Sequence, residues 1–206
     1  MYRSETAIVT GPESGMCHDT VSALGRAGMD VRRAARSAEV HAIAATLVTF
    51  DVLITLPRYP GSSAGPGEVN RGAAEISSEI DHLLRCLQPA IRHMADSGRG
   101  GRVVHVVPAA LEFCPLTGAL AAELADAGIA VNSVVLGPEV TDAEACETIA
   151  FLAGSPAAGQ TSGAEYVLVG HSMSVRGPGQ SPTRGERYLS KSLRSRLRAL
   201  HADHDC

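Results

Sequence analysis

The sequence predicts an α/β fold, in which helices cover both faces of a doubly wound, mainly parallel β-sheet. Two observations lead to this prediction. Short runs rich in β-branched residues alternate with alanine- and leucine-rich runs of helical length through residues 1–175. The chain also has 206 residues, of which 45% are hydrophobic, and this is enough for one domain with a sizeable core.

The first part of the chain is predicted to form two strands and two helices. A buried strand over residues 6–10 (TAIVT) runs into a turn over 11–15 (GPESG), and a helix over 18–27 follows. The run 31–35 is the second strand. The apolar run 38–49 is predicted to be helical, although a rebuilt strand in this segment is an open alternative.

The middle of the chain is predicted to contain two buried strands separated by the longest helix. The strand over 51–56 (DVLITL) is followed by a loop rich in Pro, Gly and Ser over 59–67. A helix over 72–96 comes next, and glycines at 98–101 end it. The run 102–107 (RVVHVV) is apolar enough to be a strand that is buried on both faces.

The last part of the domain repeats the alternation. A helix is expected over 116–126, a strand over 129–136 (IAVNSVVL), a helix over 142–153 and a last strand over 165–169. The domain is therefore expected to span residues 1–175 without an internal repeat.

Residues 176–206 are predicted to be a linker and a C-terminal amphipathic helix. The segment 176–185 is rich in Ser, Pro and Gly, and leucines then recur at helical spacing opposite arginines. The simplest use of such a helix is docking on a partner.

Composition excludes several classes of function. The formal net charge is −4 and the basic residues are scattered among 22 acidic ones, so no nucleic-acid-binding surface is expected. No apolar run approaches the ~18 residues of a membrane span, and no leader is visible. Five cysteines without CxxC spacing fit a reducing, cytoplasmic location, and the eight histidines lack a metal-binding pattern, so no metal is expected.

Several motifs resemble those of the short-chain dehydrogenase/reductase family. Residues 10–17 (TGPESGMC) resemble its TGxxxGxG turn, and 51–54 resemble the strand that leads into its NNAG motif. The closest stretch is 116–137, and 149–169 resemble the closing helix and strand. The resemblance implies a Rossmann-like fold and NAD(P)H-dependent chemistry.

The catalytic residues that the resemblance implies are absent. The family uses a tyrosine with a lysine four residues later, a serine and an asparagine, because an unassisted tyrosine of pKa about 10 is a poor base at neutral pH. Here residues 107–109 (VPA) take the serine's place, the YxxxK segment is largely missing, and the asparagine position falls near Ile76. Only one lysine, Lys191, occurs among 18 basic residues. The chain is therefore interpreted as a degenerate member that lacks the Asn-Ser-Tyr-Lys tetrad, with a sheet truncated around the third strand and a shortened active-site helix.

The resemblance identifies four vestigial cofactor-binding residues: Gly11, Ser14, Gly15 and Arg36. Cys17 replaces the last glycine of the turn, and its side chain is expected to crowd the approach of a pyrophosphate. A buried thiol is favoured over a reactive thiol with a lowered pKa at the helix start. At the position of the family's NNAG motif this chain has TLPR. The segment that follows Arg36 is too short to contain the family's third strand. Gly11 and Gly15 are therefore interpreted as a tight turn without a ligand, and Arg36 as a surface charge rather than a partner for a 2′-phosphate.

One pair in the tail offers an alternative catalyst. Tyr188 and Lys191 are spaced i, i+3, which puts a phenol and an ammonium on one face of a helix. An active NAD(P)H-dependent oxidoreductase with this divergent site is one alternative function. A regulatory module that senses a dinucleotide is another.

The leading hypothesis is a non-catalytic subunit that assembles with an intact paralogue, an NAD(P)H-dependent ketoreductase or dehydrogenase. In the family, the helices equivalent to 72–96 and 116–126 commonly form a four-helix subunit interface, and the first carries an apolar stripe, Ile76, Ile80, Leu83, Leu84, Leu87 and Ile91. The alternative is that this stripe merely covers the sheet. NADP(H) or NAD(H) is then expected in the partner rather than in this chain. The excess of arginine over lysine indicates GC-rich coding, which suits secondary-metabolite biosynthesis.

Overall fold

The computed structural model describes residues 4–58, 73–108, 114–137, 139–155 and 157–177. Seven strands form one sheet in the order β2-β1-β3-β4-β5-β6-β7. The first six strands are parallel, and β7 pairs antiparallel with β6. The predicted doubly wound parallel sheet is confirmed, with one antiparallel edge strand added.

Strands and helices alternate along the chain until the final hairpin. The elements are β1 (Thr6–Thr10), α1 (Gly15–Arg26), β2 (Asp30–Ala34), α2 (Ser37–Thr46), β3 (Val52–Thr55), α3 (Ala73–Asp96), β4 (Gly101–Pro108), α4 (Cys114–Leu124), β5 (Ile129–Leu136), α5 (Asp142–Gly154), a 3₁₀ turn (Ala158–Gln160), β6 (Glu165–Val169) and β7 (Ser172–Arg176).

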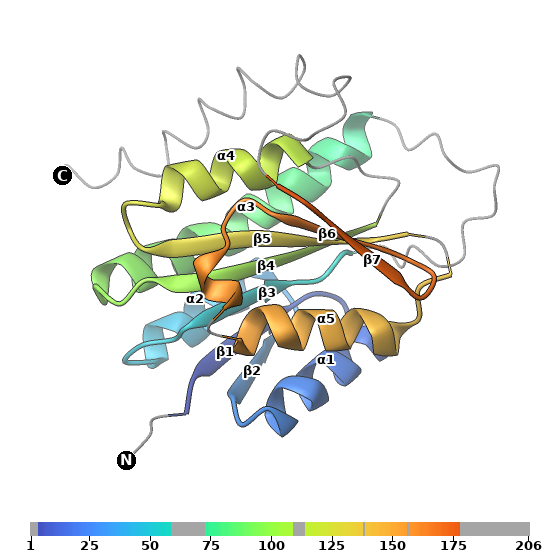
Figure 1. Ribbon diagram of the computed structural model, residues 1–206. Helices are drawn as coiled ribbons and strands as arrows, with labels where there is room; N and C mark the ends of the chain where they lie inside the picture. Colours follow the sequence, from blue (N-terminus) through green and yellow to red (C-terminus); the bar gives the residue numbers. More distant parts are fainter. Residues whose placement is uncertain (1–3, 59–72, 109–113, 138, 156, 178–206) are drawn as a thin grey trace.

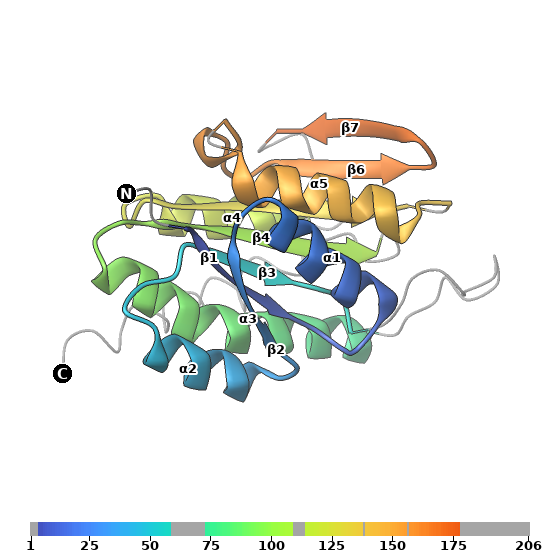
Figure 2. The ribbon, with the colours of Figure 1, turned by 90° about the horizontal axis from the view of Figure 1, so that it is seen from below.

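The sheet lies between two layers of helices (Figures 1 and 2). Helices α1 and α5 cover one face, and their core includes Leu24, Ile54 and Ile149. Helices α2, α3 and α4 cover the other face, where Phe50 and Leu120 are among the largest buried side chains. Helix α2 packs along α3 on this second face.

The apolar stripe of α3 packs against the protein's own sheet. Ile80, Leu83, Leu84 and Leu87 are all at least nine-tenths buried in one cluster with Leu53 of β3. Burial of such side chains is the main source of stability for a helix on a sheet. The interpretation that the stripe covers the sheet is therefore confirmed for these residues. The side chain of Ile76 lies outside the described residues.

The segment after β2 is a helix and not a strand. Residues Ser37–Thr46 form α2, and β2 is the outermost strand at that side of the described sheet. The alternative in which residues 38–49 rebuild a strand is therefore wrong. The sheet lacks an outer strand there because the short connection between β2 and β3 accommodates only one helix.

Strand β7 was not predicted. Gly170 adopts a φ of 51°, which lets the chain reverse tightly between β6 and β7, and Val169 pairs with Ser172 across this hairpin. All five residues of β7 are exposed. The alternation SMSVR was the available signal, but it is short and contains only two apolar residues.

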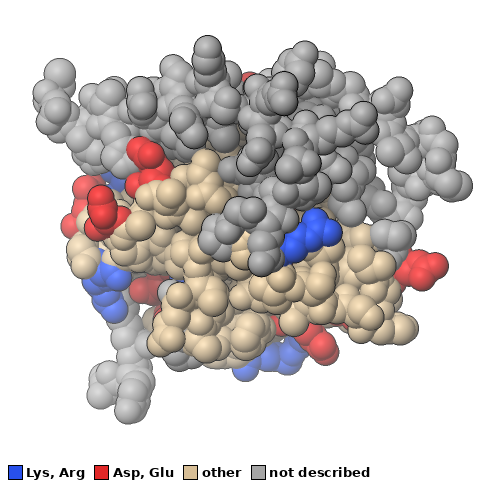
Figure 3. Space-filling view, turned by 45° about the horizontal axis from the view of Figure 1, so that its top comes forward, with Lys and Arg blue, Asp and Glu red and all other residues tan. Residues whose placement is uncertain are grey.

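Two further observations concern the surface. Within the described ranges, no helix combines the length and the apolarity that a bilayer crossing demands. In the described part of the face shown in Figure 3, acidic and basic side chains are scattered without a large patch of one sign. The predicted tail, residues 176–206, lies almost entirely outside the description.

Candidate functional site

The candidate site lies where β1, β3 and β4 end. The chain leaves β1 towards β2 on one side, while β3 lies on the other side of β1, so the strand order reverses at β1. Ligands of open α/β sheets bind at such a reversal, beyond the carboxyl ends of the strands. Thr10, Thr55 and His105 are register partners there, in one row across the sheet.

Gly11 directly follows β1 and lies against the end of β3. A Cβ atom at Gly11 would be 2.7 Å from the Cβ of Leu56, a contact too short for real Cβ atoms. Leu56 is buried, and its amide donates to the carbonyl of Thr10. The glycine is therefore required by the close packing of two strand ends, which supports the prediction of a tight turn.

The amino end of α1 is surrounded by the protein's own polar groups. The hydroxyl of Ser14 accepts a hydrogen bond from the amide of Cys17 at 3.2 Å and caps the helix. A Cβ at Gly15 would lie 3.2 Å from a carboxylate oxygen of Asp142, and Glu13 in the turn pairs with Arg33 at 3.0 Å. Two carboxylates thus lie beside the helix end that a pyrophosphate would approach.

Cys17 does not crowd the turn as predicted. Its side chain is fully buried and belongs to the core under α1 and α5. The expectation that this side chain crowds the approach to the turn is therefore wrong, and the favoured prediction of a buried thiol is confirmed. A small residue is needed at this position because the helix packs closely on the sheet.

A buried histidine lies in the row of polar residues across the sheet. The Nδ1 atom of His105 is 2.6 Å from the hydroxyl of Thr55, and His105 is 4% exposed. Burial, with a smaller contribution from His82, lowers the pKa of His105 to about 3. The imidazole is therefore neutral throughout the physiological range.

A second group of polar side chains connects β1 with α3. The thiol of Cys86 lies 3.8 Å from the hydroxyl of Thr10 and 3.8 Å from the Nε2 atom of His82. Burial raises the pKa of Cys86 to about 11, so its thiol stays protonated near neutral pH. Burial, and then the charges of Arg58 and Arg85, lower the pKa of His82.

The row of polar residues that crosses the sheet continues on β5 and β6, where hydrogen bonds join its members. The hydroxyl of Thr117 in α4 donates to that of Ser133 at 3.2 Å, and Ser133 in turn lies 3.5 Å from the carboxylate of Glu165. All three residues are buried. Their hydrogen bonds are satisfied within the protein, which is typical of a structural network.

The predicted site residues fall into two groups. Gly11, Ser14 and Gly15 come together in the turn, whereas Arg36 lies beyond the end of β2, where it pairs with Glu39 at 3.0 Å. Tyr188 and Lys191 lie outside the described residues. So do residues 109–113, which follow the end of β4 and include part of the segment predicted to have lost the catalytic serine and tyrosine.

The described residues contain one tyrosine and no lysine. That tyrosine, Tyr166, is the second residue of β6, and its phenol lies 3.3 Å from the hydroxyl of Thr161. It is 6% exposed and packs in the core under α5. Because it is near the start of its strand, it is far from the carboxyl ends of the strands and does not replace the missing phenol.

A cavity of about 430 Å³ adjoins Arg36. Its lining comes from the start of α2, the segment that follows β3 and the middle of α3, namely Ala35, Arg36, Ser37, Arg58, Asp81, His82 and Arg85. Sequence analysis did not single out Arg58, His82 or Arg85. The sequence contained a signal that these side chains could come together, because Arg58 closely follows a strand end and because His82 and Arg85, spaced i, i+3, lie on one face of a helix.

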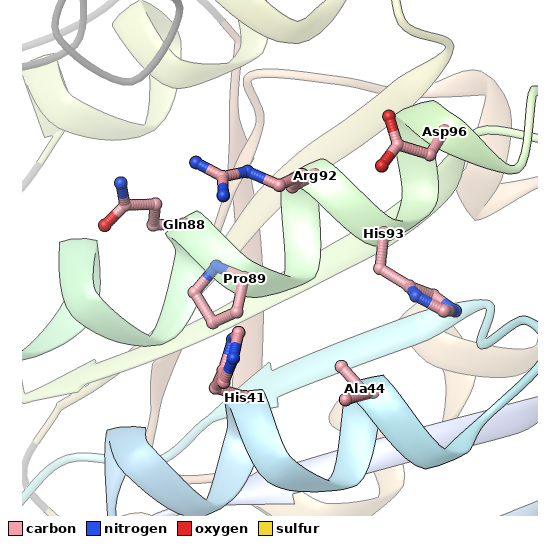
Figure 4. A pocket seen from close by; sticks show the side chains of 8 residues that line it. His41, Ala44, Gln88, Pro89, Arg92, His93 and Asp96 are labelled. Atoms are coloured by element: carbon pink, nitrogen blue, oxygen red, sulfur yellow. The ribbon is translucent and has the colours of Figure 1, made fainter. Parts of the chain in front are cut away.

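A second cavity, of about 320 Å³, lies further along the seam between α2 and α3 (Figure 4). His41 and Ala44 of α2 face Pro89 and His93 of α3. The imidazole of His93 stacks on Phe50 with ring centroids 5.3 Å apart, and its buried Nε2 atom has no hydrogen-bond partner. Among the described residues, no three metal-binding side chains gather into a site.

Comparison with solved structures identifies the architecture. No family model matches the sequence, and no curated protein does. An acetoin dehydrogenase from Enterobacter cloacae superposes with a TM-score of 0.66 at 20% identity, covering 82% of this chain and 96% of that one. The chain has the short-chain dehydrogenase/reductase fold.

Two further structures agree with this assignment. A variant of a Serratia marcescens short-chain dehydrogenase/reductase has a TM-score of 0.64 at 22% identity, over 81% of this chain and 96% of that one. A Brucella ovis oxidoreductase of the short-chain type, solved in complex with a partially ordered NAD, has a TM-score of 0.60 at 17% identity and is covered completely, by 81% of this chain. At these identities, the likeness establishes the fold alone.

Carboxylates lie near the helix end at which a fold of this kind can bind a pyrophosphate. A pyrophosphate binds at the amino end of the first helix, where backbone amides and the helix dipole favour negative charge. In this chain the carboxylates of Glu13 and Asp142 lie beside that helix end, and the hydroxyl of Ser14 already occupies one of its amides. The fold is thus present with two carboxylates near the start of its first helix, one of which, that of Glu13, pairs with Arg33.

Proposed function

We propose that this chain is a non-catalytic protein of the short-chain reductase fold that assembles with an intact NAD(P)H-dependent ketoreductase or dehydrogenase. It stabilises that enzyme or shapes its substrate entrance, and secondary-metabolite biosynthesis is the setting that suits the composition. The observation that carries the proposal is the burial of the titratable groups at the carboxyl edge of the sheet, where His105 is 4% exposed and Cys86 is fully buried.

A proton-transfer catalyst needs a group whose pKa lies near the working pH. His105, with a pKa of about 3, is a weak base, and Cys86, with a pKa of about 11, is a weak acid and holds its thiol protonated. The pKa of His82 is also below that of a free histidine. Active sites shift pKa values towards their task. These shifts move away from neutrality, as expected for groups buried for structural reasons.

An exposed apolar edge supports the assembly part of the proposal. Val169, Met173 and Val175 are each more than half exposed at the β6–β7 hairpin, and β7 ends the described sheet. Unpaired edge strands with apolar side chains associate readily with other chains. We therefore assign the first contact with the partner to this hairpin.

The helices at 72–96 and 116–126 supply a second contact in the proposal. Most of their large apolar side chains among the described residues are buried within the chain, so the outer faces would make the contact. On α4 that face carries Gly118, Ala119, Ala122 and Glu123. Small residues let a partner helix approach closely.

Co-expression tests the proposal. The chain is produced alone and together with an intact short-chain reductase encoded nearby, and native mass spectrometry gives the composition of each assembly. We expect a hetero-oligomer, no NADPH oxidation by this chain alone, and a lower activity when it is omitted from the reductase. A stable homomer with full independent activity would refute both parts of the proposal.

Fluorescence titration with NADPH and NADH tests the assignment of the cofactor to the partner. We expect no saturable binding to this chain alone at about 1 mM, and binding to the hetero-oligomer through the intact subunit. Glu13→Gln combined with Asp142→Asn is the informative variant, because it removes both carboxylates from the helix end. A gain of NADPH binding in that variant would show that these charges exclude the cofactor, whereas binding to the unchanged chain would contradict the assignment.

A further inference from the structure

We infer that the second cavity, in the seam between α2 and α3, binds a small amphoteric molecule that carries a carboxylate and an amine at the two ends of a short apolar chain. Its volume of about 320 Å³ is at the lower end of the range for small-molecule sites. This inference goes beyond the proposed function, because it assigns a ligand to this chain itself and needs neither the cofactor nor the partner.

The cavity has an apolar floor made of small side chains. Ala44 of α2 faces Pro89 of α3 across the seam (Figure 4), and Ala45 also lines the cavity. Longer side chains at these positions would fill the space between the two helices, as they do in closely packed interiors. The small ones leave a hollow whose floor can hold the methylene groups of a ligand.

One wall of the cavity contains a buried polar atom without a partner. His93 stacks on Phe50, and its buried Nε2 atom forms no hydrogen bond within the described part of the chain. Buried polar atoms are almost always hydrogen-bonded, because an unpaired one loses its contact with water without compensation. His93 lines the cavity, so a ligand there can supply the missing partner.

Two opposite charges lie at separate places on the rim. Arg92 and Asp96 are four positions apart on α3, a spacing at which opposite charges can pair, but neither forms an ion pair with a described residue. In Figure 4 the guanidinium of Arg92 is directed towards Gln88 and away from Asp96. The rim therefore has a cation beside a side-chain amide at one end and a carboxylate at the other.

This arrangement of charges selects the ligand. The guanidinium of Arg92 and the amide N–H of Gln88 can donate to the oxygens of a carboxylate, whereas Asp96 and the Nε2 atom of His93 can accept from an amine. The two ends of the rim are separated by at least one helical turn, about 5.4 Å, so an α-amino acid is too short to reach both. A dipeptide or an ω-amino acid has the required length.

Calorimetric titration of the full chain with 6-aminohexanoate tests this site. Hexanoate and hexylamine are the comparison ligands, because each carries only one of the two charges. We expect 6-aminohexanoate to bind saturably below about 10 mM and about tenfold more tightly than either comparison ligand, each of which lacks one charged hydrogen-bonding group. Glycine, whose two charges are close together, should bind no better than the comparison ligands.

Charge-removing variants assign the two ends of the ligand. Arg92→Gln should weaken the binding of 6-aminohexanoate about tenfold and change that of hexylamine less than about twofold, and Asp96→Asn should do the same with hexanoate in place of hexylamine. Arg85→Gln on the same helix is the control for Arg92, because Arg85 lines the other cavity. Asp19→Asn is the control for Asp96, because Asp19 is exposed on α1. Circular dichroism checks that each variant is folded.

The ring resonances of His93 give an independent readout of where the ligand binds. An amine beside the Nε2 atom changes the surroundings of this ring, so the resonances of His93 should shift when 6-aminohexanoate is added. Those of His105, which is buried at the carboxyl edge of the sheet beside Thr55, should not shift.

Any of three results would overturn the inference. The first is equal binding of 6-aminohexanoate, hexanoate and hexylamine, the second is an equal loss of affinity in the Arg92 and Arg85 variants, and the third is the absence of saturable binding at about 10 mM. None of them would affect assembly with a reductase. A chain that forms no hetero-oligomer should in turn still bind 6-aminohexanoate, so the two proposals fail separately.

Discussion

The two edges of the sheet expose opposite kinds of surface. At one edge, β2 carries Asp30, Arg32 and Arg33, and ion pairs link Arg32 to Asp30 and Arg33 to Glu13, each at 3.0 Å. At the other edge, Met173 and Val175 of β7 are about half exposed. Charged side chains protect a sheet edge from pairing with other chains, whereas apolar ones invite it. The edge that lacks an outer strand is therefore the protected one, and the added hairpin is the one open to a partner.

The largest expected effect is on association through the β7 edge. Met173→Glu combined with Val175→Glu places two charges in the proposed contact, and we expect the affinity for the partner to fall more than about a hundredfold, as at interface hot spots. Native mass spectrometry at graded concentrations measures the loss. Arg32→Gln on the β2 edge is the control and should leave assembly intact. Equal losses at both edges would remove the distinction between them.

The second prediction concerns the pH dependence of stability that arises from His105, which lies in β4 between the two edges of the sheet. His105 is neutral when folded because its pKa is lowered to about 3, but the unfolded chain takes up a proton below its ordinary pKa of 6.5. Above pH 6.5, His105 is neutral in both states and costs the folded state no stability. As the pH falls from 6.5 towards 3, the unfolded chain alone gains the proton, and the free energy of unfolding decreases. We expect the protein to be about 2 kcal/mol less stable at pH 5 than at pH 7.

Urea unfolding at several pH values measures this dependence. His105→Gln can still hydrogen-bond to Thr55 but does not titrate, so it should remove most of the loss between pH 7 and pH 5. His18→Gln is the control, because His18 is exposed. A pH dependence that is unchanged in the His105 variant would mean that other groups cause it.

The third prediction concerns the turn beside the β2 edge. Gly11→Ala introduces a Cβ atom 2.7 Å from that of Leu56, at a backbone φ of 156°, and we expect it to cost about 1.5 kcal/mol. Thermal unfolding measures the cost. Leu56→Gly removes the clashing atom, so the double variant should lose less stability than the sum of the single variants. Gly25→Ala in α1, where a Cβ meets nothing within 4 Å, should cause no loss.

The smallest expected effect concerns the connection between the β7 hairpin and α5. Glu144 completes a capping box with Thr141 and also pairs with His171 in the turn before β7. The backbone amide of Thr141, and then His171, hold the pKa of Glu144 at about 2, while Glu144 raises the pKa of His171.

The pH range of this connection follows from the two shifts. The contribution of Glu144 is present above its ordinary pKa of 4.5 and is lost as the pH falls towards 2, and that of His171 is present below 6.5 and is lost as the pH rises through its raised pKa. Glu144→Gln should therefore lower the melting temperature by about 2 °C at pH 5.5 and by less at pH 9. An equal decrease at both pH values would assign the whole effect to the helix cap.

The order of elements was predictable because it depends on local patterns. Alternation of β-branched and helical runs located six of the seven strands and all five α-helices, and the motifs at residues 10–17 and 116–137 led to the correct fold. The exception, β7, is a short, fully exposed strand that exists because it pairs with β6. Its formation depends on a neighbour rather than on its own composition.

The candidate site was predictable only in part. Gly11, Ser14 and Gly15 are adjacent in sequence, and their turn was identified correctly. Arg58 and Arg85 are separated by 27 positions, and both are far from Arg36 in sequence, so only the fold reveals that they line one cavity. Likewise, the sequence contains His105 and Cys86 but not the burial that moves their pKa values away from neutrality.

The sequence by itself determined the fold class, and it also determined that no lysine is available within the described domain, because these follow from residue types and their local periodicity. Tertiary structure decided which glycine packs against Leu56, which sheet edge is charged and which is apolar, and which arginines surround one cavity. Those properties depend on contacts between segments that are distant along the chain. Burial and Coulomb interactions act through space, so they arise only when the sheet has brought these segments together.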